Sequence, residues 1–193
     1  PAQQRLRGPA DLAEAHAANP QGLLLVIFDL LQDDDAVVRE GAAFGLQLIA
    51  NPNAGYSPVI KRLDDERDQY VLRRIVVASA AIGNGDLLKA LIHRAGNPAF
   101  VRERMGWSLF NFTYNVIDGI KRLGDSNIEQ GFEKLGRQTS EEIVDHLLPA
   151  ITRETFVGSD NKQPYFEIID ALLAINFITL AEAENARERF MPW

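Results

Sequence analysis

The chain has 193 residues, of which 46% are hydrophobic and 24% are charged, and its formal net charge is −7. This composition is typical of a soluble globular protein, and the negative charge argues against non-specific binding to nucleic acid. Because the sequence has no cysteine, disulfide bonds, cysteine-ligated metals and thiol catalysis are excluded. The longest apolar run, residues 23–28, is too short to cross a bilayer and no secretory signal is visible. We therefore expect a cytoplasmic protein without a membrane partner.

The predicted organisation is a single all-α domain over residues 1–193. Residues 1–20 form an N-terminal arm with a short helix, which the alanine-rich residues 11–18 predict and Asn19-Pro20 ends. Residues 21–112 contain three similar helix pairs, and residues 113–193 contain a degenerate repeat and the C-terminal helices. No segment alternates apolar and polar residues over any length, so strands are not expected.

The three helix pairs share a spacing of residues. Their first helices are predicted at residues 23–31, 59–63 and 87–92. Each second helix contains an aliphatic residue followed by arginine, at Val38-Arg39, Leu72-Arg73 and Val101-Arg102. Small or apolar residues follow each arginine by three, four and seven places, and in the third unit these are Met105, Gly106 and Leu109. The arginines lie 34 and 29 residues apart, which is the period of a helical repeat.

A turn residue precedes each of these arginines by five places, and we expect it to cap the second helix. These residues are Asp34, Asp68 and Asn97. The second helices are predicted to end at residues 51–53, at the Gly83-Asn84-Gly85 turn, and after Asn111.

After residue 112 the repeat weakens, although most of the remaining segments still predict helices. Two of these helices begin at a Thr-x-x-Glu capping box, Thr139–Glu142 and Thr179–Glu182. Residues 158–161 predict a loop. Residues 116–123 either extend the third long helix or follow it after a kink. The other predicted helices cover residues 125–135, 139–151, 164–175 and 179–190.

With this pattern of aspartate and arginine, residues 22–112 resemble the HEAT-like helical repeat family of the phycobilin-lyase type. The resemblance implies a right-handed α-solenoid, an α-α superhelix of antiparallel helix pairs, here with extra C-terminal helices. It also implies that the repeated aspartate and arginine form polar contacts between neighbouring units. The third unit departs from the family pattern, since Asn97 replaces the aspartate.

The candidate site lies on the faces of the second helices that point away from the predicted core. Such helices line the concave side in this family, so Ala78 would lie between Phe44 and Trp107 in an apolar groove. The predicted partner-binding residues are Phe44, Arg74, Ala78, Arg104, Trp107, Phe110 and Tyr114. The alternative is that the C-terminal helices fold back and bury these aromatic residues, because aromatic residues at helical spacing most often belong to a core.

The preferred functional prediction is a non-catalytic scaffold or adaptor without a cofactor, which binds a protein or peptide in this concave groove. The resemblance gives an alternative, a phycobilin lyase-like protein or another handler of tetrapyrroles. Its ligand would be a bilin, with propionates bound by Arg74 or Arg104. A second alternative, a HEAT-like DNA glycosylase using Trp107 and Asp118, is disfavoured by the negative charge.

Two acidic turns, Asp33–Asp35 and Asp64–Asp68, recur at the same place in successive units. They predict either an edge that binds a basic partner or a weak cation, or simply caps and dipole partners for the helices that follow. None of the histidines, His16, His93 and His146, has the spacing of a helical metal site, so no metal is expected. Formation of a homo-oligomer through the apolar face is an equal alternative to binding another protein.

Overall fold

The computed structural model describes residues 19–49, 51–97, 99–107, 109–136, 139, 142, 163–176 and 178–188. Within these residues the chain forms ten helices and no strand, so the prediction of an all-α fold is confirmed. Among the described helices, none combines the length and apolar character needed to span a membrane. The helix expected at residues 11–18, the loop at 158–161 and most of the helix expected at 139–151 lie outside the described residues.

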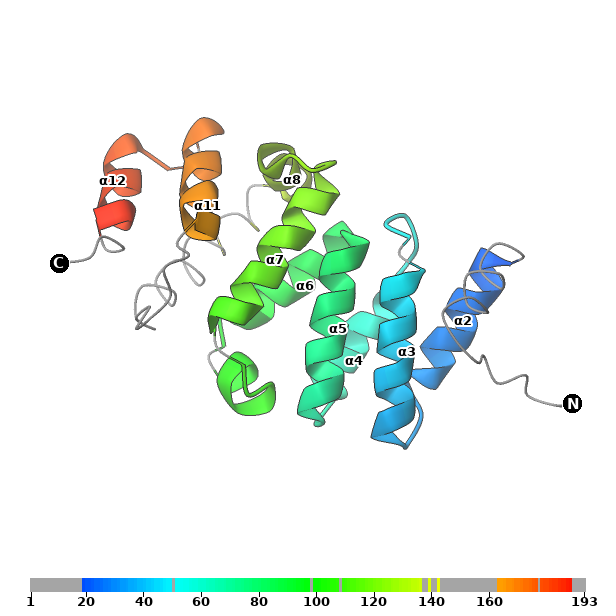
Figure 1. Ribbon diagram of the computed structural model, residues 1–193. Coiled ribbons are helices and arrows are strands. Elements are labelled where there is room, and N and C mark those ends of the chain that lie inside the picture. Colours follow the sequence, from blue (N-terminus) through cyan, green and yellow to red (C-terminus); the bar gives the residue numbers. More distant parts are fainter. Residues whose placement is uncertain are drawn as a thin grey trace, which may run out of the picture.

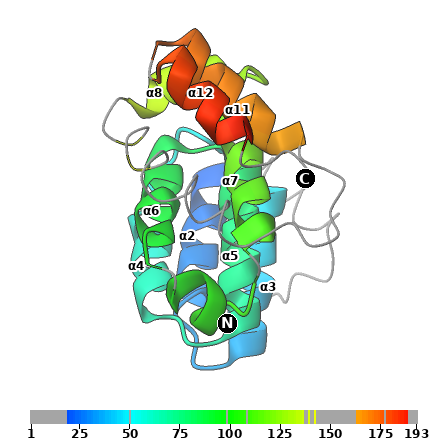
Figure 2. The same cartoon turned by 90° about the vertical axis from the view of Figure 1, so that its left-hand side faces the viewer.

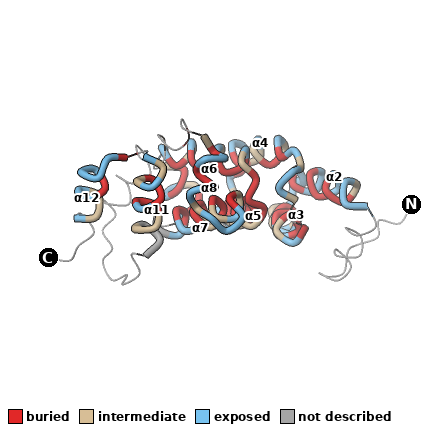
Figure 3. Tube along the Cα trace, turned by 90° about the horizontal axis from the view of Figure 1, so that it is seen from above, coloured by how far each residue is buried: buried red, intermediate tan, exposed pale blue. Residues whose placement is uncertain are grey.

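The helices from α2 to α7 form two layers that lie side by side (Figures 1 and 3). One layer consists of α3 (Ala36–Leu48), α5 (Gln69–Ile82) and α7 (Leu109–Leu123). The other consists of α2 (Pro20–Leu30), α4 (Ser57–Asp65) and α6 (Gly85–Ala95). In the first layer α5 packs between α3 and α7. Figure 2 shows the same two layers from the end of the row.

Three further helices continue the molecule beyond α7, as Figure 1 shows. They are α8 (Ile128–Leu135), α11 (Gln163–Ala174) and α12 (Leu180–Glu188). The predicted capping box at the start of α12 is confirmed, because Thr179 N donates to Glu182 Oε2 and Glu182 N donates to Thr179 Oγ1. The helix predicted at residues 164–175 is confirmed as α11.

Short polar side chains set the beginnings of the helices, as predicted for Asp68, whose Oδ1 accepts hydrogen bonds from Tyr70 N and Val71 N. Gly83 ends α5 in the left-handed conformation and Asn84 caps α6. The prediction for α3 is wrong by one residue, since Asp35 rather than Asp34 is its cap. Asp33 Oδ1 accepts the hydrogen bond from Asp35 N, and this tight turn moves the start of the helix one residue later.

The third arginine-bearing segment is broken, which corrects the prediction of one long helix. A π-helical turn, η1 (Phe100–Arg104), is followed by Gly106 with φ +58°, a left-handed conformation that glycine adopts at no steric cost. Trp107 N donates to Val101 O, so the chain folds back before α7 begins. The apolar spacing after Arg102 therefore does not form one helical stripe. Helix α7 is continuous from Leu109 to Leu123, so residues 116–123 extend the helix that contains Asn111 and do not follow a kink.

The helix predicted at residues 125–135 begins at Ile128, with Asn127 as its cap. Asp125 and Ser126 have φ values of 54° and 72° and belong to the turn before it. Close contact between α7 and α8 requires glycine, because a Cβ atom on Gly131 would lie 2.1 Å from Ile120 O. This sequence position therefore determines how near the two helices approach.

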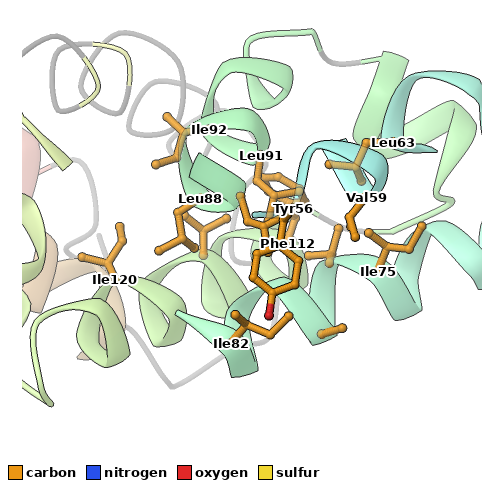
Figure 4. Packing of buried hydrophobic residues seen from close by; sticks show 14 of the residues in the cluster. Tyr56, Val59, Leu63, Ile75, Ile82, Leu88, Leu91, Ile92, Phe112 and Ile120 are labelled. Carbon is orange, nitrogen blue, oxygen red and sulfur yellow. The ribbon is translucent and has the colours of Figure 1, made fainter. Parts of the chain in front are cut away.

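The hydrophobic core runs between the two layers (Figure 4). Ile75 of α5, Leu88 of α6 and Phe112 of α7 are completely buried, and burial of each such side chain contributes on the order of 1.5–3 kcal/mol. Phe100 packs edge-on against Phe112 with ring centroids 6.4 Å apart. The aromatic pair ties the irregular η1 turn to the regular helix that follows it.

Candidate interaction surface

The first repeated arginine joins two successive helix pairs through a buried ion pair. Arg39 Nε and Nη2 donate to the two carboxylate oxygens of Glu66 at 2.8 and 2.9 Å. Its Nη1 donates to the carbonyl oxygens of Asp33 and Asp34, both at 2.8 Å. Arg39 thus connects the turn before α3 to the turn before α5, and its acceptor is Glu66 rather than the aspartate of the family pattern.

Glu66 is fully buried and every side of its carboxylate is occupied. Besides Arg39, it accepts hydrogen bonds from Arg62 Nε and from the backbone N–H groups of Arg67 and Asp68. Burial raises the pKa of this carboxyl, but the hydrogen bonds from Arg39, from the Asp68 backbone and from Arg62 outweigh it and lower the pKa to about 2. The carboxylate therefore stays ionised at neutral pH and has a structural role.

The second repeated arginine makes a different junction, between α5 and the segment before α7. Arg73 Nε donates to Met105 O, and its Nη2 donates to Gly106 O, both at 2.7 Å. Its guanidinium carbon lies 5.5 Å from the ring centre of Tyr70 and 6.0 Å from that of Trp107. The guanidinium is close enough to both rings for cation–π attraction. The third arginine, Arg102, is exposed.

Part of the predicted groove is exposed on the same layer of helices. Phe44 of α3 and Tyr114 of α7 are exposed large side chains. Arg74 of α5 lies with its guanidinium carbon 5.4 Å from the ring centre of Phe44 and its Nη2 3.6 Å from Glu40 Oε1. These contacts bring Phe44 and Arg74 together, as the predicted face requires.

Other predicted site residues do not lie as the predicted groove requires. Ala78 is only 1% exposed, so it does not lie between two aromatic residues on an open surface. Trp107 is half-buried and packs against the hydrophobic core. Besides Arg73 and Arg74, the half-exposed positions of α5 are Val77 and Ala81. The side chain of Phe110 lies outside the described residues.

Arg104 binds the end of a helix rather than pointing into a groove. Its Nη2 donates to Leu63 O and Asp64 O at 3.1 Å and also to Glu66 O. These carbonyls lie at the end of α4, where no intrahelical donor reaches them. Burial lowers the pKa of Arg104, with a smaller effect of the same sign from the charge of Arg67. Arg104 is therefore a structural cap.

The two acidic turns lie next to each other, because Arg39 contacts both of them. They are accompanied by basic side chains, and Arg94 forms a two-pronged ion pair with Asp64 at 2.9 and 2.6 Å. Across the residues that the structure describes, no three His, Cys, Asp or Glu side chains are grouped to hold a metal ion. In these turns Asp35 and Asp68 cap the helices that follow them. Asp64 and Glu66 instead form ion pairs with arginines.

Tyr70 and Arg73 are members of this surface that the sequence interpretation left out. The sequence predicts a repeated structural role for Arg73, and Tyr70 precedes it by three residues, which places the two on one side of α5. We call the set Phe44, Tyr70, Arg73, Arg74, Trp107 and Tyr114 the aromatic–arginine face. The spacing of Tyr70 and Arg73 on α5 is visible in the sequence. The contact of Arg73 with Trp107 depends on the left-handed turn at Gly106.

Comparison of the chain with protein-family models, with curated proteins and with solved structures gives no match.

Proposed function

We propose that the chain is a non-catalytic scaffold of HEAT-like helix pairs, arranged as an α-solenoid, that binds a partner protein or peptide through the aromatic–arginine face. The resemblance of residues 22–112 to this family and the order of packing α3, α5, α7 support the proposed repeat. The two contacts made forward along the chain by Arg39 and Arg73 also support it, since each links one helix pair to the next.

The observation that carries the functional proposal is the composition of this face. Tyr70 and Tyr114 are 57% and 53% exposed, and Arg73 lies within reach of both the Tyr70 and Trp107 rings. Tyrosine, tryptophan and arginine are the residues that most often dominate the binding energy of protein interfaces. Arginines already held by rings and carbonyls also lose little side-chain freedom on binding.

The test is affinity capture of partner proteins with the double variant Tyr70→Ala/Tyr114→Ala. We expect capture of the specific partners to fall by about tenfold or more, while the melting temperature stays near that of the unaltered chain. Leu180→Ala is the matched control, because Leu180 is equally exposed but lies on α12. Quantitative mass spectrometry measures the capture, and an unchanged set of proteins with the double variant would contradict the proposal.

A bilin remains the alternative ligand that the family resemblance implies. Fewer residues support the bilin alternative than the protein partner. Arg104 binds the carbonyls of α4, so only Arg74 is left to bind a propionate. Arg74 itself already lies near Glu40. Absorbance spectra of bilin titrated with the purified chain test it. The DNA glycosylase alternative has the least support, since Asp118, its expected catalytic acid, pairs with Arg122 at 3.0 Å.

A further inference from the structure

A stripe of apolar residues runs along the outside of α3, and we call it the α3 stripe. It consists of Val37, Gly41, Phe44 and Leu48, at successive spacings of four, three and four residues. Val37, Phe44 and Leu48 are 75%, 40% and 44% exposed. A Cβ atom on Gly41 would meet nothing within 4 Å. This spacing places the four residues on one side of the helix, as in a seam between two packed helices.

The equivalent stripe on α5 is buried inside the molecule. The arginine spacing of 34 residues relates α3 to α5 position by position. The equivalent positions on α5 are Val71, Ile75, Ala78 and Ile82, which are 0%, 0%, 1% and 4% exposed. Helix α5 has a neighbour in its layer on each side, whereas α3 is the first helix of that layer among the described residues (Figure 1). The stripe that is buried on α5 is therefore open on α3.

We propose that the α3 stripe is the dimer interface of this protein, and that a second copy of the chain covers it. The two copies would be related by a twofold axis, with the two α3 helices antiparallel. The α3 stripe shares Phe44 with the aromatic–arginine face. The inference still does not depend on the proposed function, because Tyr70, Tyr114 and the arginines of α5 carry that function and do not belong to the stripe.

The argument for a second copy is the symmetry of the stripe. Gly41 and Phe44 are equally distant from its midpoint, and so are Val37 and Leu48. In an antiparallel twofold pair, Gly41 of one copy therefore faces Phe44 of the other, and Val37 of one copy faces Leu48 of the other. Phe44 would lie over the partner's Gly41, where there is space for a ring, and Val37 would contact the partner's Leu48. The largest side chain thus meets the one position without a side chain.

Charge also favours this occupant. The stripe itself contains no charged residue, and the nearby Glu40 already has Arg74 of its own chain as a partner. The adjoining α2 exposes Leu25, Val26 and Leu30 at the same end of the row. Of the nine large hydrophobic side chains exposed in the described residues, six belong to α2 and α3. Such a concentration of apolar surface is typical of an interface that another protein surface covers.

The first test is the mass of the full chain by sedimentation equilibrium over a range of concentrations. We expect a reversible dimer whose dissociation constant rises by about tenfold or more in Gly41→Gln, because the new side chain fills the space for Phe44. This variant cannot lose the dimer by unfolding, since replacing an exposed helical glycine favours the helix. Leu180→Gln on α12 is the matched control and should leave the dimer unchanged.

The second test measures the register, and it is possible because the chain has no cysteine of its own. An antiparallel pair predicts that a mixture of Gly41→Cys and Phe44→Cys chains forms a mixed disulfide about tenfold faster than either variant alone, since a disulfide needs Cβ atoms roughly 4 Å apart. Leu180→Cys should form no rapid cross-link.

Three outcomes would overturn the proposal. The first is a mass equal to one chain at every concentration. The second is preferred cross-linking of like positions, which would require a parallel pair. The third is a chain that becomes dimeric only when residues 1–18 are deleted, which would make that segment the occupant of the stripe.

Discussion

Two contacts, made by Arg39 and by Arg73, join successive helices in the layer of α3, α5 and α7. Both arginines follow an aliphatic residue, but their hydrogen-bond acceptors differ. At the first, Arg39 is nearly buried and binds the carboxylate of Glu66 with two hydrogen bonds. At the second, Arg73 is half-exposed and binds two backbone carbonyls between aromatic rings. At Arg39 and Arg73 the same sequence pattern accompanies a contact with the next helix pair, but the pattern does not predict the acceptor.

The acceptor depends on the turn that enters the next unit. Glu66 lies two residues before the cap Asp68, and the residue two places before Asn97 is Ala95. The third unit thus offers no carboxylate at this point. Its chain instead folds back at Gly106 and turns the carbonyls of Met105 and Gly106 toward Arg73. One junction is closed by a salt bridge, and the other leaves an arginine at the surface.

The largest expected effect is at the first junction, in the variant Glu66→Gln. It leaves the charge of Arg39 buried without a counter-ion, and breaking a buried pair in this way costs about 3–5 kcal/mol. Urea denaturation followed by circular dichroism measures this loss of unfolding free energy. Glu133→Gln is the matched control, since Glu133 is exposed on α8. A loss no greater than that of the control would mean that the ion pair does not stabilise the fold.

Acidification should remove the same contribution gradually. The folded-state pKa of Glu66, about 2, lies below the ordinary value of 4.5. Its contribution is therefore complete above pH 4.5 and is lost as the pH falls from 4.5 through 2. The difference in unfolding free energy between the unaltered chain and Glu66→Gln should be constant near neutral pH and shrink over that acid range. A difference that is unchanged down to pH 2 would contradict the assignment.

The second junction should respond less, because its arginine is half-exposed. Arg73→Ala removes two charge-assisted hydrogen bonds and the contacts with two rings, and we expect a loss of about 1–3 kcal/mol. Arg74→Ala, the neighbouring substitution, removes a surface ion pair and should cost less than about 1 kcal/mol. Thermal and urea denaturation of both variants measure the difference. Equal losses would show that the carbonyl contacts of Arg73 contribute nothing.

Local sequence determined the helices of this protein well, since their limits depend on neighbouring residues. Apolar spacing predicted α5 and α11, and short polar side chains predicted the starts of α5 and α12 at Asp68 and Thr179. These features need only hydrogen bonds to residues two or three places away. The sequence also predicts that Phe44, Arg74 and Tyr114 lie on the open sides of their helices, and all three side chains are at least partly exposed.

Only the tertiary structure decided which arginines were available to bind a ligand and which aromatic side chains were exposed. The sequence predicts that Arg104 contacts a ligand, whereas in the structure it binds the end of α4, about 40 residues earlier in the chain. The sequence predicts that Ala78 lies in a groove, but it is buried, although the equivalent Phe44 is exposed. Their environments differ because α5 has a neighbour on both sides of its layer. Periodicity places a residue on one side of a helix, but it carries no information about what packs against that side.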